Sequence, residues 1–269
     1  IVGRVARRLS GAEICVDGLR LPVTRNHGPH QLHGGIRGLT RRLWDARTIA
    51  DDEPGVEFSL LDPAGSEGYP GNLDVVARWT LAPPCRLTLT IEARCDAPTP
   101  FNRPPHPYFT PAGHDGGAPA THRVTPAASR YAATGTDLIP TGEIAPVAGT
   151  KLDLRSSSAV DLDVEAGIRG FDHCYILDAR SDRLPAARVA SMRSGRRLDL
   201  WTDRPCLQFY TGGNLDGVAG KEGACYRAHD GFCLEAQDYP DMFAHAAFPE
   251  RLLRPGEIFR TRTVYDFTS

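Results

Sequence analysis

The chain has 269 residues, enough for one large all-β domain or two small domains. Its formal net charge is −2, from 31 basic and 33 acidic residues that are mixed along the chain, so no basic block indicates nucleic-acid binding and no acidic tail indicates disorder. No run of about 18 apolar residues predicts a membrane span, and no apolar segment at the start predicts a signal peptide.

Short apolar runs separated by turn sequences dominate the chain, and helical periodicity is scarce. This pattern is typical of antiparallel β-structure. The clearest strand is predicted at residues 86–95, where apolar side chains at every second position predict one buried face. Residues 73–81 alternate in the same way and are expected to form its hairpin partner across Pro83 and Pro84.

The remaining strands follow from shorter apolar runs. They are predicted at residues 13–16, 56–61, 174–177, 188–192, 197–201, 207–210, 232–235 and 259–267. Loops are expected at residues 112–120 and 156–161. No internal repeat and no long linker divides the chain, so the sequence predicts a single large β-sandwich domain over residues 1–269.

The seven cysteines are odd in number and include no CxxC motif. Most lie in apolar runs that resemble strands, so they are predicted to be reduced core cysteines of a protein in a reducing compartment, the cytoplasm. The alternative is a disulfide between Cys85 and Cys95.

Three histidines, His27, His30 and His33, follow one another at a spacing of three and are followed by Gly34 and Gly35. A zinc site is one interpretation, but this spacing does not bring side chains together on a strand, and the glycines favour a loop. The second interpretation is that the glycines let the backbone approach a ligand while His33 offers a hydrogen bond. The third is a turn with solvated histidines.

His106 lies between Pro105 and Pro107, which hold the backbone extended around it. Such rigidity suits a side chain that must point one way, and a histidine can donate a proton near neutral pH. Tyr108 and Phe109 are predicted to form a flat apolar wall for a sugar ring. A rigid surface turn is the alternative.

Two further polar residues lie at predicted strands. Asp172 follows Gly-Phe at the start of a strand, where it could accept hydrogen bonds from a hydroxylated ligand or simply cap a turn. Gln208 lies among apolar residues, and its amide can donate and accept hydrogen bonds. The alternative for Gln208 is a residue at the edge of a sheet.

Glu235 lies in an apolar run in which Phe232 and Leu234 share one face of the predicted strand, while Cys233 and Glu235 share the other. Taken alone, a glutamate in this position is expected to face water at the end of the strand. If it is buried instead, it must be paired or protonated.

Taken together and in this order, these motifs resemble the aldose 1-epimerase (galactose mutarotase) family, and the resemblance covers essentially the whole chain. The matching stretches are GRVARR at residues 3–8, LHGG at 32–35, GYPG at 68–71, HPYF at 106–109, GFDH at 170–173, LQFYTG at 207–212, GFCLEAQ at 231–237 and the tail at 248–257.

The resemblance implies a large antiparallel β-sandwich, often called a supersandwich, and an isomerase that uses no metal and no organic cofactor. The expected partner is a monosaccharide substrate, not nucleic acid or membrane, and the expected state is a monomer or homodimer. Carried over to this chain, the catalytic base is Glu235, the catalytic acid is His106, and the sugar-binding groups are Arg8, His33, Asp172 and Gln208.

The chain departs from the family in three places. Arg7 stands where the family usually has an asparagine, and HPYF stands where it often has Asn-His-Ser-Tyr-Phe-Asn. Both departures suggest a modified sugar, such as an acid or a phosphate. Roughly fifty residues of a usual member are also missing before Ile1, so we expect a trimmed chain without the usual N-terminal strands, or a sheet edge that is built differently.

The implied reaction interconverts the α and β anomers of a pyranose, which requires a base at the C1 hydroxyl and an acid at the ring oxygen. One alternative is a carbohydrate-binding or sensor protein on the same scaffold. Another is a different sugar enzyme, such as a lactonase, a lyase or a glycosidase. A glycosidase would need a second carboxylate near Glu235, and Asp172 is the candidate.

Overall fold

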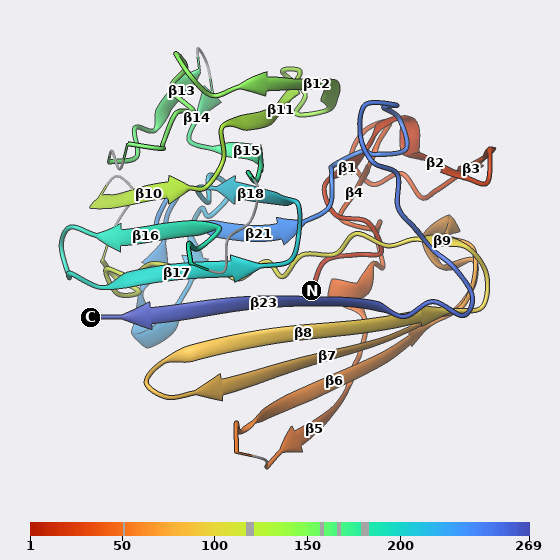
Figure 1. The fold of residues 1–269 in the computed structure, drawn as a ribbon, viewed down its shortest axis with the longest axis horizontal. Coiled ribbons are helices and arrows are strands. Elements are labelled where there is room, and N and C mark those ends of the chain that lie inside the picture. The colour runs from red at the N-terminus through yellow and green to blue at the C-terminus, as the bar shows by residue number, and fades with distance from the viewer. Residues whose placement is uncertain (51, 117–120, 157–158, 166–167, 179–182) are drawn as a thin grey trace. The chain divides into compact units, whose positions relative to one another are not determined.

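The computed structural model describes residues 1–50, 52–116, 121–156, 159–165, 168–178 and 183–269. In these residues every regular element is a β-strand or a short 3-10 helix (Figure 1), and the strand pairs are antiparallel, which confirms the predicted all-β fold. No helix in this part of the chain has the length and hydrophobicity needed to span a bilayer. Residues 117–120 and 157–158 of the two predicted loops lie outside the described residues.

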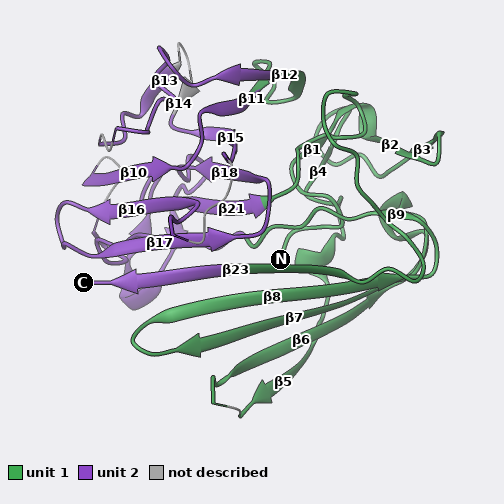
Figure 2. Ribbon diagram, viewed as in Figure 1, with its two compact units in different colours: residues 1–105, 133–143, 237–263 green, residues 106–132, 144–236, 264–269 purple. Residues whose placement is uncertain are grey.

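The chain divides into two compact units (Figure 2). Unit 1 contains residues 1–105, 133–143 and 237–263, and unit 2 contains residues 106–132, 144–236 and 264–269. The chain passes from one unit to the other more than once. One of these crossings lies within strand β23 (Phe259–Thr268). The single domain expected from the sequence stays a prediction.

Unit 1 contains a run of long neighbouring strands in the order β8-β7-β6-β5, together with short strand pairs. Its strands are β1 (Arg8–Leu9), β2 (Glu13–Val16), β3 (Leu19–Pro22), β4 (Gln31–Leu32), β5 (Asp45–Ile49), β6 (Gly55–Asp62), β7 (Leu73–Ala82), β8 (Arg86–Cys95), β9 (Thr99–Pro100) and β22 (Leu252–Leu253). Its 3-10 helices are η1 (Ser10–Ala12), η2 (Leu39–Arg41) and η3 (Ser66–Gly68).

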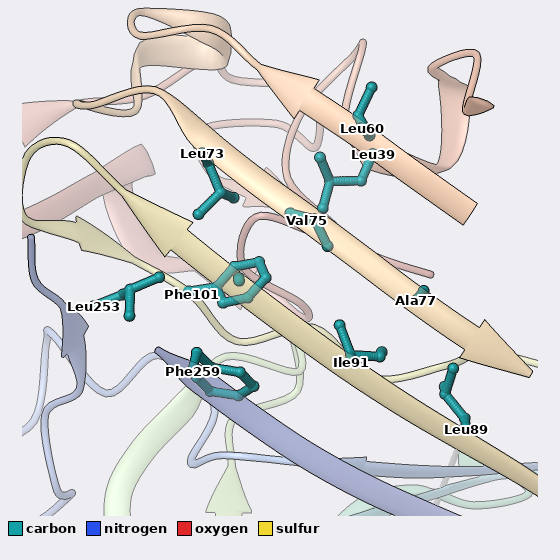
Figure 3. Close-up of a cluster of buried hydrophobic side chains, with 11 residues drawn as sticks. Leu39, Leu60, Leu73, Val75, Ala77, Leu89, Ile91, Phe101, Leu253 and Phe259 are labelled. Atoms are coloured by element: carbon teal, nitrogen blue, oxygen red, sulfur yellow. The ribbon is translucent and has the colours of Figure 1, made fainter. Parts of the chain in front are cut away.

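The hydrophobic core of unit 1 lies on one face of these long strands, where every second side chain is apolar. Val75 of β7 pairs with Ala93 of β8 and with Leu60 of β6, so a row of apolar side chains crosses the strands. Phe101 and Phe259 pack edge to face against each other in the same cluster, with ring centroids 5.1 Å apart (Figure 3). The alternation read from the sequence is therefore the pattern that buries this face.

Unit 2 contains two groups of neighbouring strands, β10-β16-β17 and β15-β18-β21, with β11 beside β15 and β12 beside β11. Its strands are β10 (His122–Pro126), β13 (Asp163–Glu165), β14 (Ile168–Arg169), β15 (Asp172–Ile176), β16 (Ala187–Ser191), β17 (Arg197–Thr202), β18 (Cys206–Tyr210), β19 (Val218–Ala219) and β20 (Cys225–Tyr226). Four strands have residues in both units, namely β23 and the strands β11 (Arg130–Thr134), β12 (Pro140–Pro146) and β21 (Cys233–Gln237). A 3-10 helix, η5 (Lys221–Gly223), lies between β19 and β20.

Every strand predicted from alternation is present, and the hairpin of β7 and β8 has the predicted pairing. Of the strands with five or more residues, the sequence analysis missed β5, β10, β11 and β12, and all of these except β11 lie at the end of their strand order. Edge strands carry polar residues and prolines because one side of the strand has no partner. Their sequences therefore lack the apolar alternation on which the prediction depended.

All seven cysteines are free thiols, so the alternative of a Cys85–Cys95 disulfide is wrong. Cys174, Cys206 and Cys233 are buried, as expected of core cysteines. Cys85 and Cys225 are exposed, so the prediction of a core position is wrong for these two. Both lie at turns or short strands, where an apolar side chain is not required to face inward.

A buried arginine ties the start of the chain to unit 1. Arg4 Nε donates to Asp62 Oδ2 at 2.7 Å, and the two side chains are 1% and 5% exposed. The guanidinium also donates to Thr99 Oγ1 and to the carbonyl oxygens of Pro70 and Pro63. A buried charge is tolerated when it is paired and its remaining donors are bonded, as they are here.

We expect replacement of Arg4 by methionine to lower the free energy of unfolding of the protein by about 3–5 kcal/mol, because it leaves the Asp62 carboxylate buried without its main partner. Urea denaturation followed by circular dichroism measures this change. The control is Arg20→Ala, which breaks an exposed ion pair with Glu13 and should cost less than about 1 kcal/mol. Equal losses in the two variants would contradict the role given to Arg4.

Candidate active site

The six residues predicted to form the site fall into two groups. His106, Asp172, Gln208 and Glu235 belong to unit 2, and Arg8 and His33 belong to unit 1. Within each unit the predicted residues lie close together, as the contacts below show.

Asp172 and Gln208 project from the same face of neighbouring strands. In the register of β15 and β18, Asp172 lies opposite Tyr210 and Cys174 lies opposite Gln208, so all four side chains share one face. Gln208 Nε2 donates a hydrogen bond of 2.8 Å to Asp172 Oδ1. A carboxylate can only accept, so this bond fixes the orientation of the amide.

The other end of the Gln208 amide is buried and makes no hydrogen bond within the described part of the chain. Gln208 is fully buried, and its Oε1 atom has no hydrogen-bond partner among the described residues. A buried acceptor without a partner costs free energy, and such groups in native proteins call for an explanation. A ligand hydroxyl that donates to Oε1 would supply the missing bond.

Glu235 is fully buried in the middle of β21, so the expectation of a carboxylate that faces water at a strand end is wrong. The physical reason is its place in the sheet, because β21 neighbours β18 and all of its residues are buried. Its Oε1 atom lies 3.5 Å from Nε2 of His106, whose side chain is 20% exposed. The Glu235 carboxylate and the His106 imidazole, both expected at the site from the sequence, are therefore in direct contact.

The contact between His106 and Glu235 follows from a single backbone bridge. Phe109 and Phe232 form an antiparallel bridge and exchange two hydrogen bonds, of 2.8 and 3.0 Å. Three residues before Phe109 and three residues after Phe232, the same antiparallel register brings His106 opposite Glu235. Pro107 has no N–H group and cannot extend the ladder, so the segment stays a short extended stretch.

The apolar wall predicted at Tyr108 and Phe109 is only half present. Phe109 packs among aromatic rings, with centroids 4.9 Å from Tyr265 and 5.9 Å from Phe267. Tyr108 is 44% exposed and lies beside the ring of His106. Alternation explains the difference, because neighbouring residues of an extended segment point to opposite sides.

Tyr210 lies on the site face and was not singled out in the sequence. It lies two residues after Gln208, so the period of two in a strand was the signal that could have identified it. Cys233, which the sequence placed on the same face as Glu235, lies two residues before it in β21. Burial raises the pKa of the Cys233 thiol, and the carboxylates of Glu235 and Asp172 raise it further. The Cys233 thiol therefore stays protonated and neutral beside the Glu235 carboxylate.

In unit 1, Arg8 and His33 lie at neighbouring positions of a two-stranded ladder, Arg8 in β1 and His33 directly after β4. Arg8 of β1 pairs with Leu32 of β4, and the next residue, His33, donates its backbone N–H to the carbonyl oxygen of Arg7 at 3.1 Å. The backbone N–H of Arg7 in turn donates to Nδ1 of His33 at 3.3 Å. Because Nδ1 accepts, the proton of the neutral imidazole is on Nε2, which is then a donor.

The backbone at these two residues is in an uncommon conformation. Arg7 and His33 have φ angles of 63° and 54°, in the left-handed region that most side chains avoid. Residues held in this region cluster at active sites and ligand-binding segments, where the surrounding structure determines them. The conformation supports a functional role for His33 and places the unusual Arg7 directly beside it.

The glycines after His33 serve the packing of the chain itself. A Cβ atom at Gly34 would lie 1.9 Å from the backbone oxygen of Gly3, and one at Gly35 would lie 2.1 Å from Glu67 Oε2. These contacts give both glycines a role in packing against Gly3 and Glu67, and the expectation that Gly34 and Gly35 let the backbone approach a ligand stays a prediction.

The three histidines do not converge on a metal. His30 Nδ1 accepts from the backbone N–H of Gly11, while His33 Nδ1 accepts from that of Arg7. In the described part of the chain, no group of three or more histidine, cysteine or acidic side chains has the arrangement of a metal site.

The unit 2 group can perform paired acid and base chemistry. A buried carboxylate faces an imidazole that is partly open to solvent, and a neighbouring carboxylate and amide offer hydrogen bonds to hydroxyl groups. Removal from bulk water strengthens each of these interactions. The arrangement suits a small polyhydroxylated ligand that gains one proton and loses another.

Comparisons with known proteins point in the same direction. A family model described as aldose 1-epimerase matches residues 1–266. The chain is 41% identical over 270 residues to galactose mutarotase of Sus scrofa, covering 100% of this chain and 78% of that protein. It is 31% identical over 274 residues to aldose 1-epimerase of Escherichia coli (strain K12), covering 99% of this chain and 78% of that protein.

Solved structures show the same fold. The GalM/aldose epimerase homologue from C. elegans superposes with a TM-score of 0.90 at 29% identity, covering 99% of this chain and 81% of that one. The galactose 1-epimerase from Lactobacillus acidophilus NCFM superposes with a TM-score of 0.86 at 28% identity, covering 99% and 78%. These likenesses confirm the galactose mutarotase-like fold expected from the sequence.

We expect Cys233 to resist thiol reagents in the folded protein at pH 8, because its raised pKa keeps the thiol protonated and burial blocks access. Cys85 and Cys225, which are exposed, should react first. Labelling with iodoacetamide followed by peptide mass spectrometry, with and without urea, measures the order. Rapid labelling of Cys233 without urea would contradict the buried neutral thiol.

Proposed function

Because the chain belongs to the aldose 1-epimerase family, a family of isomerases, we propose that Glu235 is the general base and His106 the general acid of its anomer interconversion. One observation carries the proposal, which is the 3.5 Å contact between His106 Nε2 and the buried Glu235 carboxylate. A base and an acid must act on the same sugar at two adjacent oxygen atoms, and this pair can do so.

The reaction opens and closes the pyranose ring. Glu235 takes the proton of the C1 hydroxyl while His106 gives a proton to the ring oxygen, and the C1–O5 bond breaks to leave an aldehyde and a C5 hydroxyl. The aldehyde then rotates about the C1–C2 bond. In closure, the C5 oxygen attacks C1 and returns its proton to His106, and Glu235 returns its proton to the C1 oxygen.

The proton balance of this cycle is closed. Each group gives back the proton that it took or lost, so the enzyme ends in its starting state, with the imidazole protonated and the carboxylate ionised. The direct contact of the two side chains supports this starting state, because each charge stabilises the other in a site with little water.

The remaining groups bind and orient the sugar. Asp172 accepts hydrogen bonds and Gln208 offers its buried Oε1 to a hydroxyl donor. Arg8 and His33 are assigned to further hydroxyl groups on the family resemblance, and the Nε2 proton of His33 makes it a donor. Their contribution is orientation, which converts binding into a productive geometry.

The proposed substrate is a monosaccharide in the pyranose form. The relatives are named galactose mutarotase and aldose 1-epimerase, which supports an aldohexose such as galactose. Arg7, directly beside His33, supports testing acidic and phosphorylated sugars as well. The seven free thiols support a reducing compartment, the cytoplasm, as the place where the protein works.

We expect Glu235→Gln and His106→Gln each to lower kcat by about 10²–10⁴-fold, the usual contribution of a positioned acid or base. Polarimetry of freshly dissolved α-galactose and α-glucose measures the rate above that in buffer. Anomer-exchange NMR extends the measurement to uronic acids and sugar phosphates.

The matched control is Glu222→Gln. Glu222 also faces a histidine, His114, at 3.4 Å, but it is exposed and lies outside the site. This control should retain the rate of the unmodified protein. Full activity of Glu235→Gln would refute the assignment, and tight sugar binding by a native protein that does not exceed the buffer rate would favour a binding or sensor protein.

The dependence of kcat/KM on pH is expected to be bell-shaped. Protonation of Glu235 removes the base at low pH, and deprotonation of His106 removes the acid at high pH. Because the two groups are in contact, the two limbs report the pair as a unit. Glu235→Gln should lose the acidic limb in its residual activity, and retention of that limb would assign it to another group.

A further inference from the structure

We propose that Tyr210 is a positioning residue that holds the imidazole of His106 against Glu235, a role that rests on the function proposed for that pair. Tyr210 ends β18, the strand that also carries Gln208, and its side chain lies on the site face. Its ring is in contact with the rings of both His106 and Tyr108.

The three rings support one another. The centroid of Tyr210 lies 6.2 Å from that of His106 with an interplanar angle of 72°, and 6.3 Å from that of Tyr108 with an angle of 69°. Tyr108 and His106 lie 5.5 Å apart. The two pairs that involve Tyr210 are edge to face, an arrangement that aromatic rings prefer, and the pair of Tyr108 and His106 is tilted. The imidazole therefore has an aromatic neighbour from its own segment and another from the sheet.

The prolines beside His106 do not by themselves direct the imidazole. Pro105 and Pro107 restrict the backbone, but rotation about the side-chain bonds of His106 remains free. The side chain is 20% exposed, so an orientation toward solvent is open to it. Contact with Tyr210 disfavours that orientation, because the imidazole would lose the ring that the sheet presents to it.

Tyr210 is itself held at both ends. Its backbone pairs with Asp172 in the register of β15 and β18. Its phenol oxygen accepts a hydrogen bond of 2.7 Å from the backbone N–H of Asn214, in the turn that follows the strand. A side chain that is held at its backbone and at its phenol oxygen loses little conformational entropy when it contacts a neighbouring ring. Tyr210 is thus a rigid part of the site.

The turn that holds the phenol is packed against the strand of Glu235. Gly212 has a φ angle of 69°, and a Cβ atom there would lie 2.3 Å from the backbone oxygen of Gly231. Gly231 comes just before β21, which carries Glu235. A continuous set of contacts therefore runs from this segment through the turn and Tyr210 to His106. The segment that carries Glu235 is therefore also connected, through the turn and Tyr210, to the orientation of the His106 imidazole.

Tyr210 does not exchange a proton in the reaction. Burial raises the pKa of its phenol, so the group stays protonated at neutral pH. Its oxygen is also engaged by the N–H group of Asn214. Its effect on the reaction therefore passes through His106, and this makes the proposal testable by a double-mutant cycle.

The cycle compares Tyr210→Leu, His106→Gln and the double variant by polarimetry. We expect Tyr210→Leu to lower kcat by about 10–100-fold, part of the contribution of a positioned acid, and to change KM by less than about threefold. In the double variant kcat should be no lower than in His106→Gln alone, because a positioning residue has no effect once the group that it positions is removed.

Two further variants separate positioning from general packing. Tyr210→Phe keeps the ring, loses the hydrogen bonds that the phenol makes with Asn214 and Tyr108, and should retain kcat within about fivefold. Tyr131 lies edge to face with another histidine, His173, with centroids 6.4 Å apart. His173 faces the side of β15 opposite to Asp172, so Tyr131→Leu should leave kcat unchanged.

The outcomes test the positioning role of Tyr210 separately from the proposed function. Additive losses in the double variant, or a loss in Tyr131→Leu equal to that in Tyr210→Leu, would overturn the positioning role while leaving the roles of His106 and Glu235 intact. Full activity of His106→Gln would refute the proposed function itself. If Tyr210→Leu does not fold, Tyr210→Met, which fills the space with a flexible apolar chain, replaces it in the cycle.

Discussion

The antiparallel bridge between Phe109 and Phe232 is the constraint on which the site of unit 2 depends. It exchanges two backbone hydrogen bonds and so sets the register of a short extended segment against β21. In that register His106 comes opposite Glu235, and alternation sends Phe109 into an aromatic cluster while Tyr108 stays beside the imidazole. The contact between the side chains of His106 and Glu235 thus depends on the backbone pairing of Phe109 with Phe232.

Burial then strengthens the electrostatic interaction between His106 and Glu235. Every residue of β21 is buried, so the Glu235 carboxylate is removed from water and faces an imidazole on one side and a neutral thiol on the same face of its own strand. Charges interact more strongly where water is excluded, and a buried carboxylate is stable only with partners of this kind. The cost of burying the Glu235 carboxylate is offset by its contact with His106, the proposed general acid.

Much of the architecture was predictable because β-strands with one buried face alternate strictly. The hairpin of β7 and β8 was found from that period, and strands such as β18 and β21 were found from short apolar runs. The edge strands β5, β10 and β12 were missed, because one side of an edge strand has no partner and its sequence need not alternate. The period of two places Tyr210 on the same face as Gln208, but its contact with the ring of His106 could not be predicted, because the two residues lie far apart in the sequence.

The sequence by itself determined the all-β class and the faces of the long strands, and a collinear set of short motifs supplied the proposed acid, His106, and the proposed base, Glu235. Glu235 taken alone was expected to face water, and only the tertiary structure decided that it is buried and in contact with His106. The physical reason is that alternation is a local property, set by the geometry of one strand, whereas burial and pairing depend on which strands become neighbours. That choice is made by contacts between residues such as Phe109 and Phe232, which are far apart in the chain.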